Sequence, residues 1–167
     1  MSAFTLAFAE TYGFWKLLAI LIGRLHVVLL HFPVGLLIAA GVLEVWAWWR
    51  GRSLESRASG KPAGLDAAAG ACLWLGAAAA VVTTATGWVN AAQGGSSDLI
   101  ELHRWTGTAA AVVAVVALML RAAASNAERQ GRVRSGVGAA YRVMVAVGAA
   151  AVAIAGHFGG SITHGSG

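Results

Sequence analysis

The sequence predicts an all-α integral membrane protein, a four-helix bundle with a preceding N-terminal interfacial helix. Of its 167 residues, 58% are hydrophobic and only 11% are charged, whereas soluble domains are about 45–50% apolar and about 25% charged. Four long stretches are almost free of Asp, Glu, Lys and Arg, and a membrane helix needs about 20 predominantly apolar residues. A soluble helix would carry a polar face at helical period. The last three stretches lack one, so we expect them to face lipid.

The four predicted spans cover about residues 25–49, 67–93, 103–124 and 140–162, within one membrane domain at 25–165. The third charge-free stretch, Trp105 to Leu120, is short. It reaches the length of a membrane span if Arg104 and Arg121 extend their charged ends to the interface. The only cysteine, Cys72, excludes a disulfide scaffold.

Residues 1–24 predict an amphipathic helix that lies in the outer membrane interface. The segment has no basic residue before Lys16 and contains Glu10, which is a poor match to a signal peptide. Its aromatic residues and Lys16 fit an interfacial anchor; they are Phe4, Phe8, Tyr12, Phe14 and Trp15. The alternative is that the first span simply begins earlier, near Phe14.

The basic residues predict the orientation. Nine of the twelve Lys and Arg lie in the connectors 50–66 and 121–142, whereas the connector 90–104 holds only Arg104. Short loops rich in Lys and Arg stay in the cytoplasm. Both termini and connector 90–104 are therefore expected on the periplasmic side of a bacterial inner membrane. The net charge of +5 is an orientation signal under this interpretation, and no basic patch with interleaved aromatics predicts nucleic-acid binding.

The five histidines all fall in the outer half of the predicted bundle. Ionisable groups at membrane depth usually face the bundle interior or a functional site. They are His26 and His31 in the first span, His103 at the start of the third, and His157 and His164 at the end of the fourth. Neither cytoplasmic connector contains a histidine.

Neutral imidazole binds haem iron and other metals, and bundles build cofactor sites from inward-facing side chains. We therefore expect a b-type haem held by two of His31, His103 and His157, with His26 and His164 as further candidates. His26 and His31 are five residues apart and point in different directions on a straight helix, although Pro33 can kink it there. Each histidine has the alternative of an ordinary hydrogen bond to a neighbouring helix.

Two arginines on the outer side are candidates to bind the haem propionates through bidentate hydrogen bonds. They are Arg24 and Arg104. Each is equally explained as an interface anchor. The sequence has no Cys-x-x-Cys-His motif, so no covalent c-type haem is expected on this chain. It also lacks a P-loop, a dinucleotide-binding fingerprint and a zinc-protease motif.

Several short motifs occur in an order that resembles domain-of-unknown-function family 2231, a four-span bacterial membrane domain. The resemblance covers residues 25 to 165. It rests on Leu25-His26, His31-Phe32-Pro33-Val34-Gly35-Leu36, Thr86-Gly87-Trp88, Leu102-His103-Arg104-Trp105-Thr106-Gly107 and Gly156-His157-Phe158-Gly159-Gly160-Ser161-Ile162-Thr163-His164-Gly165. Family members often carry His-Pro where this chain has His26-Val27.

The resemblance implies a redox context, because members of this family often adjoin or are fused to c-type cytochrome domains. It supplies no activity. The expected function is a haem-binding electron-transfer subunit, not a catalyst on its own, that partners a cytochrome or a larger redox complex. The alternatives are a cofactor-free accessory subunit of a respiratory or photosynthetic complex, and a copper or other metal site made by histidines at the outer face.

Overall fold

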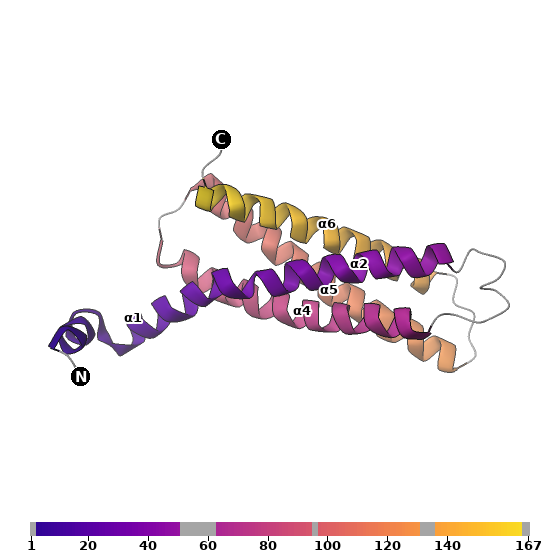
Figure 1. Cartoon of the computed structure of the whole chain (residues 1–167), viewed down its shortest axis with the longest axis horizontal. Coiled ribbons are helices and arrows are strands. Elements are labelled where there is room, and N and C mark those ends of the chain that lie inside the picture. Colours follow the sequence, from indigo (N-terminus) through magenta and orange to yellow (C-terminus); the bar gives the residue numbers. More distant parts are fainter. Residues whose placement is uncertain (1–2, 51–62, 95–96, 131–135, 165–167) are drawn as a thin grey trace.

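In the computed structural model, the chain forms an all-helical bundle, described for residues 3–50, 63–94, 97–130 and 136–164 (Figure 1). The helices are α1 (Ala3–Leu29), α2 (His31–Arg50), α4 (Ala63–Ala91), α5 (Asp98–Arg129) and α6 (Val137–His164). Helix α1 leads into α2 across a break at Leu30. Four segments are long and apolar enough to span a membrane: Gly13–Arg50, Gly64–Ala91, Asp98–Ala127 and Val137–Thr163. The predicted all-α membrane bundle is thereby confirmed.

Both described ends of the chain lie at the same end of the bundle (Figure 1). The chain runs along the bundle four times in alternating directions, so its beginning and its end lie on the same side. Helix α2 packs along α4 and α5 packs along α6, while α1 packs on α4. The core between the helices is rich in alanine, with Ala77, Ala114 and Ala117 almost fully buried. Small side chains let helix backbones approach closely, which is how membrane helices associate.

Helix α1 changes direction at Gly13. This glycine has φ 68° and ψ 149°, a conformation that favours a residue without Cβ. From Phe14 onward the helix continues toward the first span, and the segment that is long and apolar enough to cross a membrane begins at Gly13. The two aromatic side chains after the turn, Phe14 and Trp15, are exposed. The segment before it is helical, and its side chains lie outside the described ones.

Helix α5 begins with a side-chain cap. The Ser97 hydroxyl accepts a hydrogen bond from the Ile100 N–H at 3.3 Å. Serine is a favoured residue at this position because it satisfies one of the free N–H groups of the first turn. Asp98 and Glu101 add negative charge near the positive end of the helix dipole. The cap fixes the start of α5 one turn before His103.

Candidate functional site

A cavity of about 920 Å³ lies between the helices toward the end of the bundle that carries both described chain ends. Residues from α1, α2, α4, α5 and α6 line it, and most of its wall is apolar. Cofactor sites of this size usually carry a few convergent polar groups. Three of the five histidines line the cavity, and two of them, His26 on α1 and His103 on α5, lie close to each other.

Helix α4 holds the His26 ring in one orientation. The distance from His26 Nδ1 to the carbonyl oxygen of Thr83 is 2.8 Å. One turn later, Gly87 leaves room for the ring: a Cβ atom there would lie 2.8 Å from His26 Cε1. A carbonyl oxygen can only accept a hydrogen bond, so Nδ1 is the protonated nitrogen and Nε2 carries the lone pair of the neutral ring.

Helix α6 holds the His103 ring in the same manner. His103 Nδ1 donates to the carbonyl of Ala155 at 2.8 Å. Gly159, again one turn later, would place a Cβ atom 3.0 Å from His103 Cε1. Each histidine therefore lies on one helix and is oriented by a carbonyl of a later helix, α4 for His26 and α6 for His103. Each ring occupies the space above a glycine four residues after that carbonyl.

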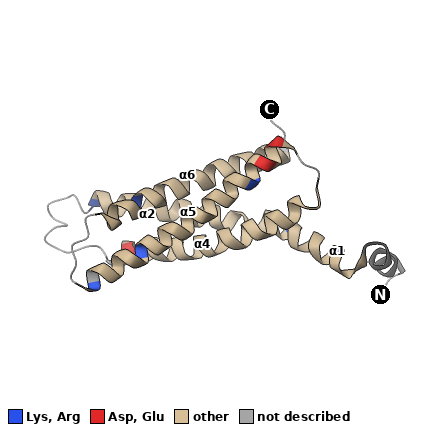
Figure 2. Ribbon diagram, turned by 180° about the vertical axis from the view of Figure 1, so that it is seen from behind, with Lys and Arg blue, Asp and Glu red and all other residues tan. Residues whose placement is uncertain are grey.

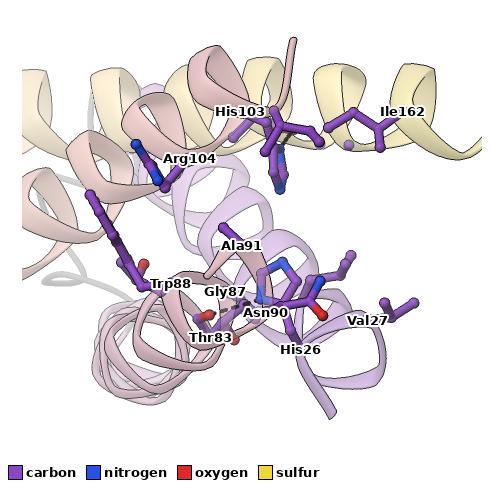
Figure 3. A pocket seen from close by; sticks show the side chains of 18 of the residues that line it. His26, Val27, Thr83, Gly87, Trp88, Asn90, Ala91, His103, Arg104 and Ile162 are labelled. Atoms are coloured by element: carbon purple, nitrogen blue, oxygen red, sulfur yellow. Dashed lines mark hydrogen bonds between the residues drawn. The ribbon is translucent and has the colours of Figure 1, made fainter. Parts of the chain in front are cut away.

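The two lone-pair nitrogens point toward one another across the cavity (Figure 3). The ring centres of His26 and His103 are 6.0 Å apart, and the ring planes make an angle of 73°. Two imidazoles that share one metal ion at about 2.0–2.1 Å from each nitrogen have ring centres about 6 Å apart. The hydrogen bond on the other ring nitrogen is the usual arrangement of a metal-binding histidine.

Two buried polar atoms at the cavity have no hydrogen-bond partner. They are Thr83 Oγ1 and Arg104 Nε, and no other such side-chain atom occurs in the described part of the chain. Both residues line the cavity. Buried polar groups are nearly always satisfied in proteins, and unsatisfied ones indicate a missing water, ion or ligand. Both atoms are therefore free to bind a water molecule or another group in the cavity.

Arg104 lies beside the histidine pair at the cavity wall (Figure 3). Its guanidinium lies over the Trp88 ring, 4.2 Å from the centroid, and pairs with Glu101 at 2.9 Å. Trp88 in turn donates from Nε1 to the Thr108 hydroxyl at 3.1 Å. Arg24 also lines the cavity and is exposed. Both predicted arginines thus reach the site from different helices.

The remaining predicted histidines are placed differently. His31 lines the cavity but is exposed, whereas His157 is exposed and does not line it. His157 lies near Phe158, with ring centres 6.0 Å apart. The His164 side chain lies outside the described ones. The structure therefore pairs His103 with His26, not with His31 or His157.

No group of three or more His, Cys, Asp or Glu side chains converges anywhere in residues 3–50, 63–94, 97–130 and 136–164. Within these ranges, His26 and His103 therefore form a pair and are not part of a larger cluster of such side chains.

A polar cluster that the sequence does not reveal lies at the opposite end of the bundle. Arg121 turns inward instead of extending to the interface: it bonds to Glu44 Oε1 at 3.1 Å, to the Tyr141 hydroxyl at 2.9 Å and to Asp66 Oδ2 at 3.0 Å. The Tyr141 hydroxyl also donates to Glu44 at 2.5 Å. One arginine thus joins α2, α4, α5 and α6. The available signal was an acidic and a basic residue, Glu44 and Arg121, within otherwise apolar spans.

Comparisons of the chain with protein-family models, with curated proteins and with solved structures find no match.

Proposed function

We propose that the protein is a membrane electron-transfer subunit that binds one b-type haem between His26 and His103. The observation that supports this most directly is the histidine pair itself: two imidazoles with Nδ1 held by backbone carbonyls, 6.0 Å apart, with their free nitrogens directed at each other. A haem bound there would supply reversible one-electron transfer. The chain's own contribution is to hold both rings in a fixed orientation through their Nδ1 atoms.

The cavity wall fits a flat macrocycle. Three of its glycines, Gly107, Gly156 and Gly160, have no atom within 4 Å of the position where a Cβ would lie. A planar ligand can therefore lie close to the α5 and α6 backbones. Arg24 and Arg104 are the residues that would bind the propionates, and Arg104 Nε is buried without a partner.

The distribution of charge supports a periplasmic site in a bacterial inner membrane. Most of the described basic residues lie at the bundle end opposite the chain ends (Figure 2). Lys and Arg mark the cytoplasmic side of membrane proteins. The charge distribution thus supports a periplasmic location for the cavity and both termini, where a c-type cytochrome or a larger redox complex would exchange electrons with the protein.

The first test is the absorption spectrum of the purified protein. We expect b-type bands after reduction and one haem per chain by the pyridine hemochrome assay. His26→Ala and His103→Ala should each lose nearly all bound haem, because one of the two residues that would hold it is removed. The exposed His157→Ala is the matched control and should retain it.

Other outcomes of that experiment are equally informative. Wild-type protein without haem overturns the proposal. If elemental analysis then finds bound copper, the result supports a metal site made by histidines. If the protein contains neither metal nor haem, the result supports a cofactor-free accessory subunit. Retention of haem in both the His26 and His103 variants assigns the ligands elsewhere.

The ring angle predicts a second spectroscopic property. Because the two imidazole planes are 73° apart, the two iron orbitals that interact with them are expected to be nearly equal in energy. The oxidised protein should then give a single low-field signal in electron paramagnetic resonance at liquid-helium temperature. A three-line rhombic spectrum would contradict it and indicate nearly parallel rings.

A further inference from the structure

We infer that a lipid-soluble quinol binds at a lateral opening of the cavity, with its hydroxyl group on His31. This site is separate from the histidine pair. Binding depends on the cavity alone, whereas electron delivery from the bound quinol to the haem rests on the proposed function.

The opening lies between α1 and α6. In the described structure α1 packs on α4, and α1 and α6 are not a substantial packing pair. Val27 of α1 and Ile162 of α6 line the cavity and are also exposed, with 51% and 39% of their surface accessible. Figure 3 shows both on the same side of the cavity. A residue that is both cavity-lining and exposed marks a place where the cavity meets the surroundings.

Like Val27 and Ile162, His31 both lines the cavity and is exposed. It makes no hydrogen bond within the described residues. It lies five residues after His26, about 8 Å further into the membrane at 1.5 Å per residue. An imidazole at membrane depth without a partner is costly and usually functional.

The backbone beside His31 adds a second hydrogen-bond acceptor. The chain breaks between α1 and α2 at Leu30, and Pro33 follows in the first turn of α2. Proline has no N–H, so the carbonyl of Leu29 lacks its usual helical donor. The Leu30 carbonyl receives only a long bond of 3.4 Å from the Val34 N–H. The segment is therefore richer in acceptors than in donors.

These features select the ligand class. A molecule that enters from the bilayer interior must be lipid-soluble, which excludes free anions and sugars. A phospholipid keeps its polar group at the interface, and its acyl chain offers nothing to His31. A quinol combines an apolar tail, a flat ring and hydroxyl donors, so it satisfies the unpaired acceptors at this depth.

The quinol supplies both the electrons and the protons of this reaction. One quinol releases two electrons and two hydroxyl protons and leaves as the quinone. The electrons reduce two copies of the haem-loaded protein, or one copy twice when a periplasmic cytochrome removes the first electron. An unprotonated ring nitrogen of His31 accepts each proton and returns it to water.

Binding is tested with a photoreactive azidoquinol, kept reduced under anaerobic conditions, on the detergent-solubilised protein, with labelled peptides mapped by mass spectrometry. We expect labels near His31 on α2 and near Ile162 on α6, and competition by an unlabelled decyl-benzoquinol. His31→Ala should weaken this competition about three- to tenfold, the value of one net hydrogen bond. Val27→Trp should block the opening, and His157→Ala should change nothing.

Electron delivery is tested on the haem-loaded protein by anaerobic stopped flow with decyl-benzoquinol. His31→Ala should slow haem reduction by the quinol but not by dithionite, which needs no quinone site.

The quinol site is overturned if the photolabels fall on other segments. It is also overturned if labelling is unchanged in both His31→Ala and Val27→Trp. Site-specific labelling without haem reduction overturns electron delivery alone. Loss of haem in His31→Ala would show that His31 is a haem ligand and would overturn its role in the quinol site. Wild-type protein without haem would overturn the proposed function, and the photolabelling result alone would then decide whether quinol binds.

Discussion

Gly87→Val and Gly159→Val are each expected to remove nearly all bound haem while the helices remain assembled. A Cβ at these positions would lie 2.8 Å from His26 Cε1 and 3.0 Å from His103 Cε1, closer than van der Waals contact allows. Each ring is also fixed by a 2.8 Å hydrogen bond to a carbonyl of the same helix, four residues earlier. The ring therefore cannot move away without losing the bond that orients its Nε2.

The matched control is Gly35→Val, because nothing lies within 4 Å of its Cβ position and it does not line the cavity. Haem content and helical circular dichroism are compared for all three variants. We expect full helicity in all three and bound haem only in Gly35→Val. Normal haem content in both Gly87→Val and Gly159→Val would show that the rings are not held where the structure places them.

Arg121→Met is expected to give the largest loss of stability of any single substitution in the bundle. Removing one member of a buried ion pair leaves the other charges without a partner, which typically costs about 3–5 kcal/mol. Here Glu44, with 11% of its side chain exposed, and Asp66 would both lose their cation. Arg121→Lys should recover little, since one ammonium cannot reproduce the planar set of donors that contacts three helices.

Thermal unfolding in detergent measures this effect, with Arg142→Met as the control because Arg142 is exposed near the same end of the bundle. Adding Glu44→Gln to Arg121→Met should restore part of the lost stability, since it removes a buried unpaired charge. If Arg121→Met unfolds at the temperature of Arg142→Met, the cluster contributes no net stability.

The spans followed from the sequence because charge is so scarce that its position alone marks the helix ends. The pairing of His26 with His103 did not follow from the sequence, because His26 and His31 lie on one continuous stretch and only its rotation decides which ring faces His103. That rotation depends on Thr83 and Gly87, which are 57 or more residues away in the chain. The sequence around a histidine does not show which distant backbone carbonyl or glycine will orient its ring.

The sequence did not predict the inward position of the Arg121 side chain, for a similar reason. A basic residue near the end of an apolar run is expected to extend to the interface. Here Gly70 leaves space for the guanidinium, since a Cβ there would lie 2.7 Å from Arg121 Nη2. Glu44 and Asp66 then compensate its charge. The interior position is set by residues on three other helices, not by the local sequence.

The matching arrangements around His26 and His103 bear on how the protein matures. Each imidazole is oriented within one helix pair, α1 with α4 or α5 with α6, and neither ring's own hydrogen bond crosses to the other pair, although Trp88 of α4 donates to Thr108 of α5 beside them. Each half of the site can therefore be complete when its own pair has inserted, before the pairs associate. A ligand held by both rings then connects two separately formed units, and its binding free energy adds directly to their association.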